Sequence, residues 1–173
     1  MWSGSRRPKK LPVYVNEEEF SSLLDFVKIT HKIAFLLAWG CGMRISEVLK
    51  VTPEEIDFKE KRIRINEGKG KKDRIVPIPK GMRKDHLKHL PFNFKDRALQ
   101  KMFRKAAEKS GLKKTKPSVH FHSLRHGFAV QCLKKGISLK AIQKMLGHSD
   151  LSTTGIYLEL APEDVLNEYM EKF

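Results

Sequence analysis

The spacing of apolar residues constrains the fold of this 173-residue chain more than any other feature. Along most of the chain they recur every three or four residues, as between Leu99 and Ala106, which predicts amphipathic helices. Residues 58–79 differ, because Ile63 and Ile65 alternate there with polar neighbours, the pattern of a half-buried strand. The sequence therefore predicts an α+β fold that is mainly α-helical, with one small antiparallel β-sheet or hairpin.

Capping residues predict where several helices begin and end. Asn16, followed by glutamates at 17–19, predicts a helix start, since the side chain caps the first turn and the acids lie at its positive end. A nearly all-apolar helix over His31–Cys41 is expected to be central. Helices are expected to end at three glycines, Gly111, Gly136 and Gly147.

The charge balance points to a polyanionic partner. The formal net charge is +15 and the pI is about 9.9. A domain this basic usually meets nucleic acid, although a stable lysine-rich surface without a partner gives the same composition. Eight lysines and arginines lie between Lys59 and Arg74, against three acids. From Asp150 onward the balance reverses, with six acids and one lysine.

Several classes of protein are disfavoured by what the chain contains. Cys41 and Cys132 lie in apolar, helix-like contexts, which predicts buried, unbonded thiols in a reducing compartment. Neither has metal-ligand spacing to another cysteine, so we expect no metal and no cofactor. The longest apolar run, Ile33–Trp39, is too short to span a bilayer, and the N-terminus has no signal-peptide stretch. We expect a cytoplasmic protein without a small-molecule substrate.

The chain divides into three parts. Residues 1–12 are basic and contain prolines, which indicates an arm or linker, and residues 1–5 could be a cloning remnant. Residues 13–161 form the principal domain. Residues 162–173 are expected to form an amphipathic C-terminal helix.

A small set of residues stands apart from this scaffold. His122 and Arg125 are three positions apart at a predicted helix start, so they share a face. Each member also has an ordinary interpretation: a surface salt bridge, a solvated lysine, a helix cap or a half-buried ring. Their order along the chain is more informative than any one of them. The set is Arg44, Lys69, His122, Arg125, His148 and Tyr157.

This order, with the residues around it, resembles the tyrosine recombinase, or phage integrase, family, in particular its Xer-like branch. Five stretches carry the resemblance: 42–49 (GMRISEVL), 68–77 (GKGKKDRIVP), 122–129 (HSLRHGFA), 146–150 (LGHSD) and 152–157 (STTGIY). Two positions depart from the usual pattern, Met43 and Gly155. Members usually carry a helical DNA-clamping domain ahead of the catalytic one, and about a dozen residues precede the match here. Both an excised domain and a naturally minimal protein fit this observation.

The resemblance implies a catalytic domain, over 13–161, that breaks and rejoins DNA. Tyr157 would attack the phosphodiester and form a covalent 3′-phosphotyrosyl intermediate, which keeps the bond energy so that no ATP is needed. Arg44 and Arg125 would donate paired hydrogen bonds to the non-bridging oxygens.

The remaining residues of the set would move protons. His122 and His148 suit donation to the phosphoryl group and exchange of the tyrosine proton near neutral pH, and the two are not distinguished. Lys69, at the tip of the basic hairpin, would protonate the leaving 5′ oxygen. His126, next to Arg125, is interpreted either as structural or as a support for a neighbouring catalytic residue. Because side-chain cations would stabilise the transition state, the implied mechanism uses no metal.

The implied partner is double-stranded DNA, with self-assembly into dimers or tetramers on it, in a nucleoid, plasmid or viral context. The basic hairpin and the stretch Lys101–Lys116 are the expected phosphate-binding faces. A type IB topoisomerase and a non-catalytic helix-turn-helix module, built around Leu124 and Ile142, remain as alternatives. The expected DNA contacts are Lys71, Lys72, Arg74, Lys113, Lys114 and Lys116.

The acidic tail generates the first prediction. Five apolar residues share one helical face, which must be buried either on the same domain or on a neighbouring subunit: Val165, Leu166, Tyr169, Met170 and Phe173. If the tail docks on a neighbour, deletion of 162–173 weakens cooperative assembly on two-site DNA and leaves single-site binding nearly intact. Sedimentation of both complexes measures this. Unchanged cooperativity with a lower melting temperature of the monomer would identify a helix packed on its own domain.

Overall fold

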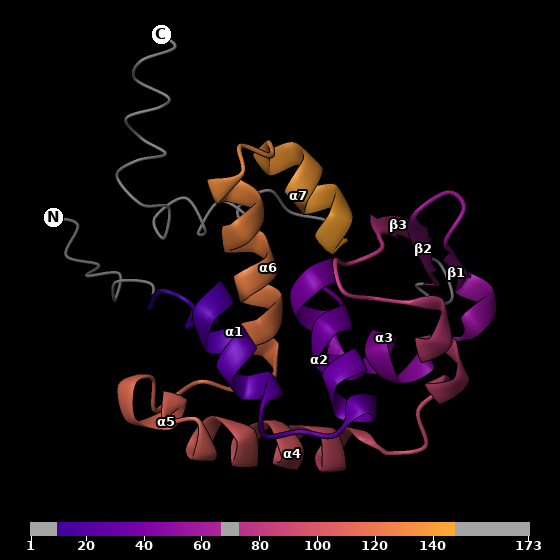
Figure 1. Cartoon of the computed structure of the whole chain (residues 1–173). Coiled ribbons are helices and arrows are strands. Elements are labelled where there is room, and N and C mark those ends of the chain that lie inside the picture. Colours follow the sequence, from indigo (N-terminus) through magenta and orange to yellow (C-terminus); the bar gives the residue numbers. More distant parts are fainter. Residues whose placement is uncertain (1–9, 67–72, 148–173) are drawn as a thin grey trace, which may run out of the picture.

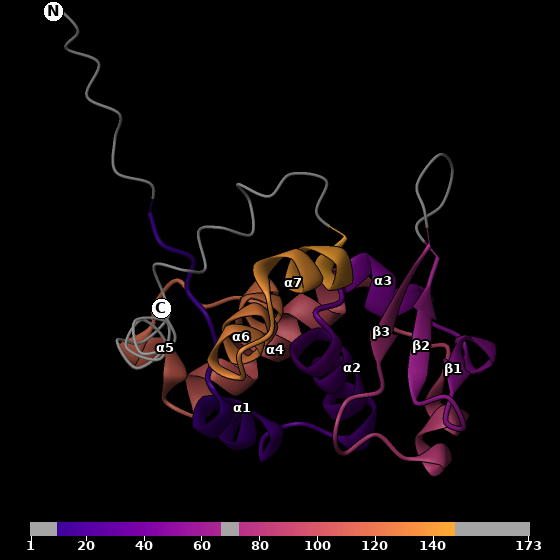
Figure 2. The ribbon, with the colours of Figure 1, turned by 90° about the horizontal axis from the view of Figure 1, so that it is seen from above.

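The fold confirms the α+β expectation. The structure, a computed structural model, describes residues 10–66 and 73–147. Within them, most of the helices pack together and a small sheet lies at one side of this group (Figures 1 and 2). The α-helices are α1 Glu17–Leu24, α2 Ile29–Cys41, α3 Ile45–Lys50, α4 Asp96–Lys109, α5 Leu112–Thr115, α6 His122–Lys134 and α7 Leu139–Leu146. The short 3-10 helices and strands are η1 Pro53–Glu55, η2 Lys84–His89, β1 Ile56–Asp57, β2 Arg62–Ile65 and β3 Arg74–Pro77.

Helix α2 is the centre of the core, as its apolar sequence predicts. It packs along α6, while α4 runs across the ends of both helices (Figure 1). Three rings join these elements: Phe35 of α2, Phe103 of α4 and Phe121 just before α6, with centroids 5.6 to 6.1 Å apart and tilted or edge-on. Such pairs favour one packing geometry beyond the burial of their area. The cluster therefore fixes where α6, and with it His122 and Arg125, begins.

The sheet lies beside the helices and is antiparallel, in the order β1-β2-β3 (Figure 2). Ile63 pairs with Val76, and both are buried, whereas Arg64 and its partner Ile75 face outward. The alternation in the sequence thus sets which side of the sheet meets the core. Strand β1 was not expected, because a two-residue strand is too short to show a periodic pattern.

The predicted caps are largely confirmed. The side chain of Asn16 accepts from the Glu19 backbone N–H while the Glu19 carboxylate accepts from that of Asn16, a reciprocal capping box. Gly147 follows α7 in the left-handed conformation, with φ of 70°. Helices η2 and α5 were missed, since segments this short lack an apolar period. The predicted C-terminal helix over 162–173 lies outside the described residues.

Both cysteines are buried and unbonded, as predicted. Burial raises the pKa of the Cys41 thiol far above its usual value and that of Cys132 to about 11, so both stay protonated at neutral pH. In the described part of the chain, no helix has the length and apolar character needed to cross a membrane.

The N-terminal segment is anchored on α6 through a close backbone approach. Trp39 of α2 donates its indole N–H to the Val15 carbonyl at 3.0 Å and stacks on Phe20 at 4.2 Å. A β-carbon at Gly127 would lie 2.3 Å from that carbonyl oxygen and 3.0 Å from the Trp39 indole. Any residue larger than glycine would push the segment off the helix.

We therefore predict that Gly127→Ala lowers the free energy of unfolding by about 1–3 kcal/mol, the usual cost of overpacking. Lys134→Ala, exposed on the same helix, is the control and changes it by no more than about 0.5 kcal/mol. Urea unfolding followed by circular dichroism measures both. Equal midpoints for the two variants would contradict the close packing.

Candidate active site

Arg125 lies in the first turn of α6 and is almost fully buried, with 2% of its surface exposed. Its Nη1 donates to the Gly42 carbonyl at 2.6 Å, and its Nη2 donates to the Leu146 carbonyl at 2.8 Å. Gly42 ends α2 and Leu146 ends α7, so one guanidinium joins the ends of two helices to the start of a third. The ends of α2 and α7 approach closely here, because a β-carbon at Gly42 would lie 2.7 Å from the Leu146 side chain.

Arg44 stands at the N-cap of α3 with 38% of its side chain exposed. Its backbone N–H donates to Glu47 at 2.7 Å, and its Nη1 lies 3.9 Å from the same carboxylate. A guanidinium that is anchored at its base and open to solvent is suited to bind an anion from outside.

Glu47 is the residue that sequence reasoning missed. Its carboxylate accepts from the Arg44 backbone and from two nitrogens of Arg74, and it lies 3.9 Å from Nη1 of Arg125. Burial alone would raise the pKa of Glu47, but hydrogen bonds and charge from Arg74, with help from Arg44, lower it overall. The available signal was its position three residues after Arg44, the spacing of a capping box.

Arg74 has a different place from the one predicted for it. It was expected to grip DNA phosphates at the surface, but only 6% of its side chain is exposed and its guanidinium is bonded to Glu47. Its Nε donates to the Met145 carbonyl at 2.8 Å. The reason is the strand register: Arg74 pairs with Ile65 on the inward side of the sheet. A charge run in the sequence does not reveal this orientation.

His122 is the first residue of α6 and is exposed. Its ring lies edge-on to His126, with centroids 4.6 Å apart, and 6.1 Å from His120. The pKa of His122 is lowered to about 4, mainly by desolvation and in smaller part by the positive charges of Arg125, His120 and Arg44, in that order. His122 is thus neutral at pH 7, with one ring nitrogen able to accept a proton.

The three predicted lysine contacts of the 113–116 segment differ in their surroundings. Lys113 donates to the Pro117 and Val119 carbonyls at 2.9 and 2.8 Å. Lys116 donates to the Tyr14 carbonyl at 2.7 Å and pairs with Glu19 at 2.9 Å. Lys114 is exposed. The first two therefore bond to neighbouring parts of the fold, and the predicted DNA contact of Lys114 stays a prediction.

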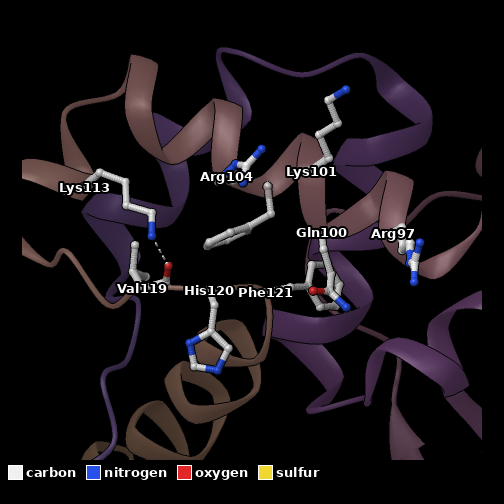
Figure 3. A pocket seen from close by; sticks show the side chains of 9 residues that line it. Arg97, Gln100, Lys101, Arg104, Lys113, Val119, His120 and Phe121 are labelled. Atoms are coloured by element: carbon white, nitrogen blue, oxygen red, sulfur yellow. Dashed lines mark hydrogen bonds between the residues drawn. The ribbon is translucent and has the colours of Figure 1, made fainter.

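A basic hollow of about 320 Å³ lies between α4 and the segment before α6 (Figure 3). Arg97, Lys101 and Arg104 line it from α4, with His120 opposite. The His120 ring also lies 6.1 Å from that of His122, so the hollow adjoins the region of His122. The sequence indicated the basic stretch from Lys101 onward, but not Arg97 or His120.

The other predicted site residues lie outside the described residues: Lys69, Lys71, Lys72, His148 and Tyr157. Strands β2 and β3 bracket the segment that contains Lys69, and α7 ends just before His148. Within residues 10–66 and 73–147, no three His, Cys, Asp or Glu side chains are grouped so that they could hold a metal ion. The predicted absence of a metal cofactor stays a prediction.

The depressed pKa of His122 generates a testable pH dependence. Its folded value of about 4 is below the ordinary 6.5, so the unfolded chain binds more protons between these values. The contribution of neutral His122 to the free energy of unfolding is therefore fully present above pH 6.5 and is lost as the pH falls through about 4. We predict an NMR titration midpoint of about 4 for the His122 ring and a shallower acid dependence of unfolding in His122→Gln. A midpoint near 6.5 would contradict this environment.

Known proteins share both the sequence and the fold. The profile of the phage integrase family matches residues 14–91 and 87–164. The tyrosine recombinase XerA of Thermococcus onnurineus (strain NA1) is 34% identical over an alignment of 177 positions, gaps included, that spans 90% of this chain and 61% of the relative. This chain thus spans about three fifths of that relative's length.

Two solved structures have the same fold. The catalytic domain of bacteriophage HP1 integrase superposes with a TM-score of 0.67 and 23% identity, over 94% of this chain and 95% of that one. The XerH site-specific recombinase in a post-cleavage complex with palindromic difH substrate gives 0.73 and 22%, over 92% and 53%. The match of the family profile along most of the chain, on this fold, establishes that the chain belongs to the phage integrase family.

Proposed function

We propose that this chain is the catalytic domain of a site-specific DNA recombinase that cleaves and rejoins strands through a covalent bond to Tyr157. One observation carries the proposal: Arg44, Arg125 and His122 converge on one region although they are up to 81 positions apart in sequence (125 − 44). Both arginines lie 3.9 Å from the Glu47 carboxylate, and both charges act on His122.

The arrangement suits stabilisation of a phosphoryl transition state. Attack on a phosphodiester adds negative charge to the non-bridging oxygens, and preorganised cations lower its energy without reorganisation cost. Arg44 offers its guanidinium at the surface. Arg125 is 2% exposed and its Nη1 and Nη2 donate to the Gly42 and Leu146 carbonyls, so in this arrangement it contributes its positive charge in place of the paired hydrogen bonds expected from the sequence. Neutral His122 beside them can accept a proton and then return it. In this mechanism Lys69 protonates the leaving 5′ oxygen, and His148 shares the proton transfer with His122.

The same face is suited to hold DNA. The basic hollow lined by Arg97, Lys101 and Arg104 adjoins His120 and so lies next to the proposed reaction centre. Such contacts position a duplex through its phosphates. The DNA-bound XerH structure shares this fold, which supports DNA as the partner here. Assembly of two or four chains on DNA is part of the proposal.

Tyr157→Phe is the direct test, because it keeps the ring and removes the attacking oxygen. On a nicked suicide substrate, we expect the wild-type chain to give a covalent protein–DNA band on a denaturing gel. The variant should bind DNA with equal affinity and give no such band. Tyr14→Phe is the matched control and should form the adduct normally.

The outcomes separate the alternatives. An adduct that persists in Tyr157→Phe would assign the nucleophile to another residue. No adduct with either protein, despite DNA binding, would favour the non-catalytic binding module. Relaxation of supercoils without strand exchange between two duplexes would favour a type IB topoisomerase.

A further inference from the structure

All three nitrogens of the Arg74 guanidinium donate hydrogen bonds, and their acceptors lie on two separate elements, α3 and α7. Nη1 and Nη2 donate to the two oxygens of Glu47, the second at 2.8 Å, and Nε donates to the Met145 carbonyl at 2.8 Å. Its side chain is 6% exposed. A buried arginine that makes a bidentate contact with a carboxylate is fixed in one orientation, and the carboxylate is fixed with it.

The carboxylate that Arg74 holds is the one shared by the proposed catalytic arginines. Glu47 accepts from the Arg44 backbone and lies 3.9 Å from Nη1 of both Arg44 and Arg125. If the carboxylate rotates, its relation to both guanidiniums changes together. The orientation of Glu47 is therefore a common determinant of the site, and the fork of Arg74 sets it.

The second contact of Arg74 lies at the end of α7. The Met145 carbonyl accepts from Arg74 and the next carbonyl, that of Leu146, accepts from Arg125. These are C-terminal carbonyls with no partner within the helix, and a helix C-terminus favours cations. One arginine comes from β3 and the other from α6, so sheet and helices meet at the residues that precede His148 in the chain.

We propose that Arg74 is a positioning residue for strand cleavage, which fixes Glu47, and through it Arg44 and Arg125, while it clamps the end of α7 to β3. This inference rests on the proposed function. In this proposal Arg74 acts through Glu47 and not through contact with the DNA. Because β3 begins just after the segment that contains Lys69, the same residue joins the strand after that segment to the arginine cluster.

The chemistry requires arginine at this position. A lysine keeps the positive charge but offers a single nitrogen, which cannot grip both oxygens of Glu47 and reach Met145 as well. Arg74→Lys is therefore a conservative change in charge and a severe one in geometry. Arg74→Met removes both and leaves Glu47 buried without its main counter-charge, which can destabilise the fold by itself.

The experiment measures the single-turnover rate of cleavage of suicide DNA at a saturating concentration of protein. The DNA affinity and the folded fraction of each protein are measured alongside. We expect Arg74→Met to cleave about 100-fold more slowly, the cost of a misplaced catalytic group, with unchanged affinity. Arg74→Lys should show a smaller loss. Glu47→Leu/Arg74→Met replaces both members of the buried pair by apolar residues, so neither charge of the pair is left alone, and it should still cleave slowly per folded molecule.

Arg83→Lys is the matched control. Arg83 makes the same kind of two-point contact, to Asp85 at 3.0 and 3.2 Å, but on the surface, where 67% of its side chain is exposed. This variant should cleave at the wild-type rate. A reporter that does not depend on cleavage is the Nε–H NMR signal of Arg44 and Arg125, which should shift in Arg74→Lys and stay in place in Arg83→Lys.

The two proposals fail in different ways. A wild-type chain without adduct overturns the proposed function. A wild-type chain that forms the adduct, with wild-type cleavage rates per folded molecule in Arg74→Lys and in the double variant, overturns the positioning role alone. Loss of DNA affinity in step with cleavage also overturns it, because Arg74 would then act in binding.

Discussion

The site depends on one buried carboxylate placed among three guanidiniums. Like charges as close as those of Arg44, Arg74 and Arg125 repel one another, and the anion of Glu47 makes their approach possible. Its lowered pKa keeps it ionised at neutral pH, although burial acts in the opposite direction. A buried charge that is removed from such a group leaves the others uncompensated, so the cluster behaves as a unit.

The framework around this cluster is rigid where the cluster needs it. The Phe35, Phe103 and Phe121 rings fix the start of α6, and the close approach at Gly127 holds the N-terminal segment along the same helix. Arg125 then bridges the ends of α2 and α7. The geometry of the arginines follows from packing contacts made by residues without any chemical role. In this respect the small aromatic core and the active-site candidates are parts of one arrangement.

Much of the fold could be predicted from periodicity alone. Helix α4 has clear apolar spacing, α2 was predicted from its nearly all-apolar sequence, and the alternation of Ile63 and Ile65 identified the sheet. Short elements such as β1, η2 and α5 could not be predicted, because two to six residues do not define a period. Of the candidate site, the order of residues indicated Arg44, His122 and Arg125. The roles of Glu47 and Arg74 depend on contacts across 27 residues, which no local pattern encodes.

Two consecutive carbonyls at the end of α7 also affect the electrostatic field of the site. The Met145 carbonyl accepts from Arg74, and the Leu146 carbonyl accepts from Arg125. Carbonyls supply dipoles and no net charge, so they steady the guanidiniums without cancelling them. Three guanidiniums and one carboxylate sum to a charge of +2 for these four side chains. Backbone carbonyls thus take the place of water around these guanidiniums, and the net positive charge that attracts a distant anion is kept. Any polyanion that approaches this cluster meets a positive potential that is already assembled, and its association rate should rise as the salt concentration falls.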